Sequence, residues 1–125
     1  MVIKIANARI VKTMLGFEKE IGVCTWYLTL ETSDFYTTFG GRRIDVIDKK
    51  TGEVSGDSLG LTSLLRMLQA LDVSAWEELK GQYIQVQLEI DPLGACQLIA
   101  VGHFMKDQWF NVSKFYREQS NVQSS

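Results

Sequence analysis

The chain has 125 residues, 46% of them hydrophobic, which is enough for one domain with an ordinary core. Its formal net charge is -2, and basic residues are interleaved with acidic ones. This balance argues against a binder of duplex DNA, which usually carries a basic stripe. No apolar run approaches the roughly 20 residues that span a bilayer, so we expect a cytoplasmic protein without a membrane segment.

Strand patterns fill the first third of the chain. Residues 2–12 are rich in β-branched side chains, and residues 23–32 alternate between apolar and polar positions. Residues 15–22 read as a connection between these strands, bounded by glycines. Residues 34–39 form a third strand, which Gly40-Gly41 breaks or bulges, and pairing resumes over residues 44–47.

The middle of the chain is helical, and the last third returns to sheet. Leucines at 61, 64, 65, 68 and 71 have helical spacing, with Asp57 or Ser58 as the cap. Residues 74–77 match a capping box that opens a short second helix. Residues 84–90 alternate as a strand, residues 91–94 turn, and residues 96–104 pair back as a hairpin. A last short helix covers residues 111–119.

This order predicts an α+β fold. We expect a mainly antiparallel sheet of about five to six strands, with two to three helices packed on one face. The single domain covers residues 1–119, and residues 120–125 form a disordered polar tail.

The segment FGGRRID, residues 39–45, holds the parts of a nucleotide site. Two glycines expose backbone amides, and Arg42 and Arg43 offer planar donors suited to phosphate. Phe39 supplies a flat face for a base, and Asp45 could accept from ribose hydroxyls. The alternative is a solvated Gly-Gly bulge with two surface arginines. No Walker or GxGxxG spacing is present.

The segment VGHFMKDQWF, residues 101–110, contains the single histidine of the chain. Asp107 could orient the ring of His103, but no activated nucleophile accompanies it. Trp109 and Phe110 would fold back to close the core, or Trp109 could offer a stacking surface. With one histidine and two distant cysteines, no metal site is expected. We therefore expect a protein that is not an enzyme and that has no cofactor.

Four stretches together resemble small phage and prophage proteins of Gram-positive hosts. They are LGFE (15–18), FGG followed by Asp45, LLRMLQALDVSAWEELKG (64–81) and VGHFMKDQWF. Within that group the chain is similar to the Thoeris anti-defence sponges. The resemblance implies a homo-oligomer in the host cytoplasm that captures a small anionic nucleotide of the cyclic ADP-ribose type without cleaving it.

In that reading Phe39, Arg42, Arg43 and Asp45 hold the ligand, with His103 or Trp109 added from a neighbouring surface. The chain departs from the family pattern at Arg42-Arg43, where the relatives carry aromatic or aliphatic residues after the two glycines.

Two other functions fit the same residues. Tyr27, Tyr36 and Tyr83 fall on strands and suit an interface or an aromatic wall. The chain could therefore inhibit a host defence protein by direct contact. It could also be an accessory factor that binds single-stranded nucleic acid, since aromatic side chains on a sheet with nearby arginines can stack bases.

Overall fold

A computed structural model describes the backbone of residues 2–124 and the side chains of residues 2–119. Its strands are β1 (Val2–Glu18), β2 (Val23–Glu31), β3 (Tyr36–Arg43), β4 (Asp45–Ile47), β5 (Val54–Gly56), β6 (Tyr83–Ile90), β7 (Cys96–Gly102) and β8 (Trp109–Phe110). Its α-helices are α1 (Ser58–Leu71) and α2 (Val112–Ser124), and Trp76–Glu78 form one turn of 3₁₀-helix. The predicted α+β class is confirmed.

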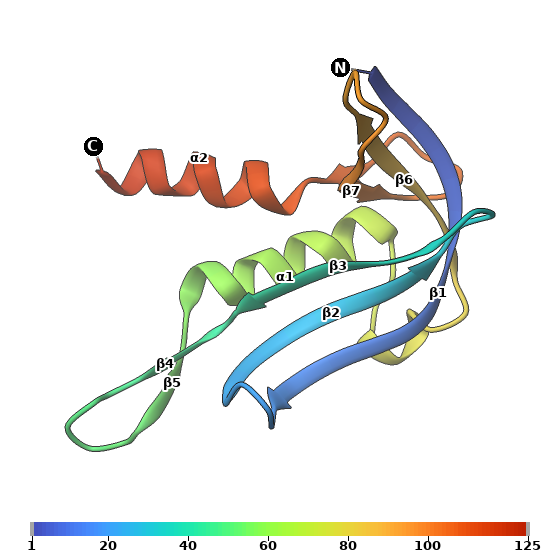
Figure 1. The fold of residues 1–125 in the computed structure, drawn as a ribbon. Coiled ribbons are helices and arrows are strands. Elements are labelled where there is room, and N and C mark those ends of the chain that lie inside the picture. The colour runs from blue at the N-terminus through green and yellow to red at the C-terminus, as the bar shows by residue number, and fades with distance from the viewer. Residues whose placement is uncertain (1, 125) are drawn as a thin grey trace.

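One curled antiparallel sheet contains six of the strands, in the order β3-β2-β1-β6-β7-β8. The long strand β1 joins the two halves of this sheet (Figure 1). Its residues 2–9 pair with β6, and its residues 9–18 pair with β2. Because one strand serves both halves, it must bend, and the sheet curls around the side chains on its inner face.

The order and the connections match those of an OB fold, a partly open five-stranded Greek-key barrel. Here β1, β2, β3, β6 and β7 are the five strands, and α1 lies in the chain between β3 and β6. Strand β3 contacts β7 without entering the ladder beside it, so the barrel is partly open. β8 and α2 continue the chain beyond these five strands.

The core fills the inside of this barrel. Trp26, Leu28 and Leu30 of β2 are buried there because alternate residues of a strand face the same side. Phe39 of β3 packs against Trp26, and Phe110 of β8 packs against Phe39, with ring centroids 6.0 and 6.1 Å apart. Further core residues come from α1, β6 and β7: Leu64, Met67, Leu71, Ile84, Val86, Leu88 and Val101.

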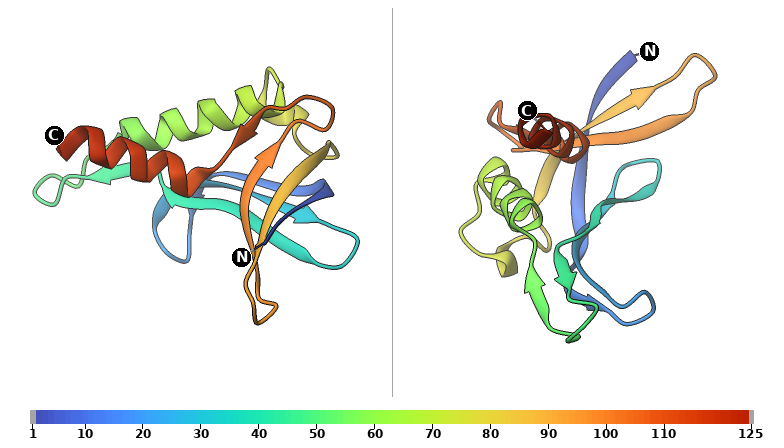
Figure 2. Two further views of the ribbon diagram at one scale, coloured as in Figure 1. Left: turned by 90° about the horizontal axis from the view of Figure 1, so that it is seen from above. Right: turned by 90° about the vertical axis from the view of Figure 1, so that its left-hand side faces the viewer.

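Both α-helices lie side by side over the same side of the sheet, as expected (Figure 2, left). Helix α1 begins at the predicted cap, since the Asp57 carboxylate accepts from the amide of Gly60. It ends at Asp72, whose backbone is left-handed with φ 57°. Arg42 of β3 lies over the Tyr116 ring of α2, with 4.5 Å between the guanidinium carbon and the ring centroid.

Several local predictions need correction. The connection expected over residues 15–22 is shorter, because residues 15–18 pair with residues 23–26 and extend the hairpin. The resumed strand, β4, pairs with β5 in a separate projecting hairpin (Figure 1). In the expected capping box, Glu78 rather than Glu77 reaches back, to the amide of Ser74. The last hairpin strand ends at Gly102, so His103 lies beyond it.

The bulge expected at Gly40-Gly41 is confirmed by a register shift opposite residues 25–27. The limits proposed for the domain, 1–119, and for the tail, 120–125, stay predictions. Helix α2 continues through Ser124, and the side chains of residues 120–125 lie outside the described part of the chain.

Candidate functional site

The FGGRRID segment does not form an exposed pocket. Phe39 is only 2% exposed and packs between Trp26 and Phe110, so its ring offers no free face to a base. This corrects the role expected for Phe39. The burial follows from strand alternation, which turns Phe39 to the inside of the barrel, opposite Leu28.

Asp45 is buried and already paired. Its carboxylate accepts from the amide of Cys24 at 3.1 Å and from Nε of Arg43 at 2.9 Å. Burial acts to raise the pKa of Asp45, but the hydrogen bonds from Arg43 and Cys24 outweigh it and leave the pKa below its ordinary value. Arg43 and Asp45 thus hold the end of β3 to β2.

His103 and Trp109 have local partners as well. The Nδ1 atom of His103 accepts from the amides of Met105 and Lys106 at 2.9 and 3.0 Å. Asp107 accepts from Trp109 Nε1 at 2.8 Å, which corrects its expected role as the partner of His103. Trp109 lies against Gly102, and Phe110 enters the core. The interpretation of this segment as a closure of the core is confirmed for Phe110.

The six predicted site residues therefore do not converge on one cavity. His103 lines a pocket below the end of α1, whereas Trp109 lines a hollow beside α2. Arg42 stacks on Tyr116, and Arg43 pairs with Asp45.

A different set of side chains gathers on the outer face of the barrel. Directly opposed residues on neighbouring strands point to the same face. Arg9 of β1 is opposite Tyr83 of β6 on one side and Glu31 of β2 on the other, and Glu31 is opposite Tyr36 of β3. With strands 4.7–4.9 Å apart, this row of four residues spans roughly 14 Å.

The next two rows continue this face along β1, β2 and β3. Lys12, Thr29 and Thr38 form one row, and Met14, Tyr27 and Gly40 form the next. A β-bulge after Ile10 adds one residue to β1, which places Lys12 outside although Ile10 points inside. We call the outward side chains of these three rows the tyrosine face.

The tyrosine face is exposed, hollowed and locally basic. Tyr83 is 62% exposed and Tyr36 is 67% exposed. A hollow of about 320 Å³ lies between Arg9, Glu31 and Tyr83. Among the side chains that the structure describes, Arg9 and Lys12 enter no ion pair. Two free cations therefore lie among three tyrosines.

Glu31 is the carboxylate within this face, and it orients Tyr36. The Tyr36 hydroxyl donates to Glu31 Oε2 at 2.7 Å. This hydrogen bond, together with the negative charge of Glu31, raises the pKa of Tyr36 above its ordinary value. The sequence predicts the three tyrosines on strands, but Arg9 and Lys12 are not among the predicted site residues. The pattern that could have identified these two residues is a basic side chain at an outward position of β1, the strand shared by both halves of the sheet.

Comparisons of the chain with protein-family models, with curated proteins and with solved structures found no match. Neither α1 nor α2, over the described residues, has the length and apolar character of a membrane-crossing helix.

Proposed function

We propose that the chain binds single-stranded nucleic acid on the tyrosine face and does not alter it chemically. The observation that carries this proposal is the row of Tyr83, Arg9, Glu31 and Tyr36 across four strands of an OB-type barrel. OB folds bind oligonucleotides on the face of their second and third strands, which here are β2 with Glu31 and β3 with Tyr36, and on the flanking loops. This deepens the accessory-factor alternative that the sequence left open.

The chemistry of the face suits a single strand better than a duplex. Base–aromatic stacking needs unpaired bases and is worth about 1–3 kcal/mol per base. Tyr36 and Tyr83 lie at the two ends of the row with their rings exposed, and Arg9 between them can neutralise a phosphate. Because stacking tolerates every base, this face alone predicts binding with little sequence preference.

The experiment is fluorescence anisotropy with a labelled oligothymidylate of about 12 nucleotides, compared with a duplex of equal length. We expect the single strand to bind more tightly than the duplex, and salt to weaken the binding. Tyr36→Ala and Tyr83→Ala should each reduce affinity by at least about fivefold.

Phe17→Ala is the matched control, because Phe17 is similarly exposed, at 56%, but is opposite Cys24 on the other face of the strand pair. It should bind as the wild type does. If Tyr36→Ala and Tyr83→Ala bind as tightly as Phe17→Ala and the wild type, the proposal is wrong.

Two other functions stay predictions: capture of a cyclic ADP-ribose-type nucleotide, and inhibition of a host defence protein. The homo-oligomer expected for them also stays a prediction. A nucleotide at residues 39–45 would have to displace Arg43 from Asp45 and Arg42 from Tyr116. Calorimetric titration with cyclic ADP-ribose separates the two readings. Heat with this nucleotide, and no binding of oligothymidylate, would favour the sponge.

A further inference from the structure

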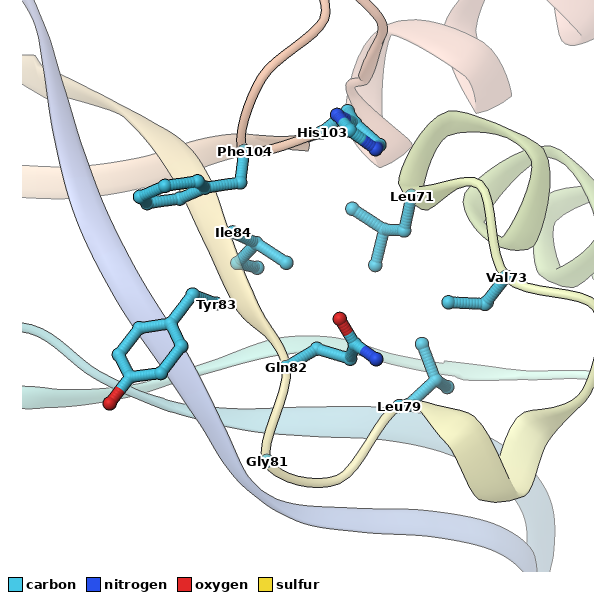
Figure 3. Close-up of a pocket in the computed structure, with 9 residues that line it drawn as sticks. All are labelled: Leu71, Val73, Leu79, Gly81, Gln82, Tyr83, Ile84, His103 and Phe104. Carbon is cyan, nitrogen blue, oxygen red and sulfur yellow. The ribbon is translucent and has the colours of Figure 1, made fainter.

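A pocket of about 570 Å³ opens where the end of α1, the start of β6 and the turn after β7 meet (Figure 3). Its volume lies within the range of small-molecule sites. Apolar side chains form its wall: Leu71, Val73, Leu79 and Ile84. Leu79 and Ile84 belong to the buried core, so this wall is fixed by packing.

Hydrogen bonds also hold in place the residues that carry the polar groups of the pocket. The amide of Gln82 donates to the Leu79 carbonyl at 3.0 Å, and the Gln82 carbonyl accepts from Ile10 at 2.9 Å. His103 is held by the two amides that donate to its Nδ1, so its Nε2 carries the ring proton and can act as a donor. The site is therefore formed before any ligand arrives.

Figure 3 shows the Gln82 side chain directed into the space between Leu71, Val73 and Leu79. Its amide makes no hydrogen bond to any side chain or backbone group that the structure describes. A primary amide offers a donor and an acceptor in one plane, and glutamine pairs with the N6 and N7 atoms of adenine in this way. Adenine repeats the donor–acceptor pattern on its N6/N1 edge.

One residue, Tyr83, connects this pocket with the tyrosine face. Tyr83 lines both the pocket and the hollow beside Arg9. The Phe104 ring, at the pocket rim, meets the Tyr83 ring nearly edge-on with centroids 6.4 Å apart. A strand that stacks on Tyr83 would therefore lie beside the Phe104 ring at the pocket rim.

We infer that the pocket takes one adenine base from a single strand bound on the tyrosine face, with Gln82 reading the base edge. This inference rests on the proposed function and adds a base preference to it. The apolar wall of Leu71, Val73, Leu79 and Ile84 would contact the base, and the Gln82 amide would provide the directional contact.

The test compares labelled oligothymidylate of about 12 nucleotides with a set of the same oligomer in which a single deoxyadenosine occupies each position in turn. For the wild type, the best-placed deoxyadenosine should strengthen binding by about fivefold, the value of a hydrogen-bonded base contact. In Gln82→Ala the ratio of the two affinities should fall to about one.

Gln97→Ala is the matched control, because Gln97 is also an exposed glutamine but lies at the far end of β7. It should keep the wild-type ratio. The adenine pocket is wrong if the gain in affinity from deoxyadenosine persists in Gln82→Ala, or if the wild type shows no such gain. Binding of oligothymidylate would still support the tyrosine face in either case. If neither oligomer binds the wild type, both proposals fall.

Discussion

Gly40 lies against Trp26 so closely that a side chain at position 40 has no room. A Cβ atom there would be 2.8 Å from the Trp26 carbonyl oxygen and 2.9 Å from Cζ3 of its ring. Gly41 has a similar backbone, with φ 91° against 99° for Gly40, yet nothing lies within 4 Å of its Cβ position. The first glycine of the pair therefore serves the packing of the core.

This difference predicts unequal costs for two alanine substitutions. Gly41→Ala should lower the free energy of unfolding by about 1–2 kcal/mol, the cost of a left-handed backbone. Gly40→Ala adds a clash with Trp26 and should cost about 3 kcal/mol or more. Urea unfolding followed by tryptophan fluorescence measures both. Equal losses would show that the contact with Trp26 is not the constraint.

A second prediction concerns the buried indole of Trp26. Its Nε1 donates to Ser63 Oγ at 3.2 Å, and Ser63 donates to the Gly60 carbonyl at 2.6 Å. Ser63→Ala removes the acceptor and should lower the free energy of unfolding by about 1–3 kcal/mol. Thr62→Ala, one position along α1 and away from Trp26, is the control and should change it by less than about 0.5 kcal/mol.

The ion pair of Arg43 and Asp45 predicts a pH dependence of stability. Because the pKa of Asp45 is lower in the folded protein than the ordinary 3.8, its contribution is complete above that value. The contribution is lost as the pH falls through the lowered pKa of the folded state. Asp45→Asn should therefore lower the urea midpoint at pH 7, and the difference from the wild type should shrink in acid.

The exposed Asp34 provides the matched control. Asp34→Asn should leave the urea midpoint at pH 7 close to that of the wild type. A gap between wild type and Asp45→Asn that stays constant down to the acid limit would contradict the assigned role of the Asp45 carboxylate.

Arg9 predicts a change in the salt dependence of nucleic-acid binding. Each phosphate neutralised on a single strand contributes about -0.7 to the slope of log affinity against log salt. Arg9→Gln should weaken oligothymidylate binding and make the slope shallower by about that amount. Anisotropy titrations at several salt concentrations measure the slope, and an unchanged slope would remove Arg9 from the contact surface.

Replacing Glu31 should change the oligothymidylate affinity in the opposite direction to replacing Arg9. Glu31→Gln removes a negative charge from the tyrosine face and keeps an acceptor for the Tyr36 hydroxyl. Oligothymidylate affinity should rise by up to about fivefold. The pKa of Tyr36 should return toward its ordinary value, which NMR titration of its ring carbons would detect. Weaker binding in this variant would mean that Glu31 contacts the ligand.

Much of the fold could be predicted from periodicity. The alternation in β2 and β6 and the leucine spacing of α1 identified the elements that bury the most apolar surface, because burial itself imposes these periods. The length of β1 could not be predicted, since Gly16 and the charged residues after it read as a loop. Only pairing with β2 reveals a strand there.

The candidate site was harder to predict than the fold. Phe39, Arg43 and Asp45 are adjacent in sequence and have the right chemistry, but strand alternation buries the first and the third. Arg9, Glu31, Tyr36 and Tyr83 lie on four strands and meet through register alone. Register depends on contacts between distant segments, which no local pattern records.

The double pairing of β1 bears on how the chain is made. Residues 2–9 are translated well before their partners in β6, residues 83–90. The β1–β2 hairpin can close early, whereas the backbone groups of residues 2–9 that pair with β6 must wait for that strand. The barrel therefore closes only after β6 has been made, and a ribosome stalled before residue 83 would hold a sheet in which one edge of β1 is unpaired.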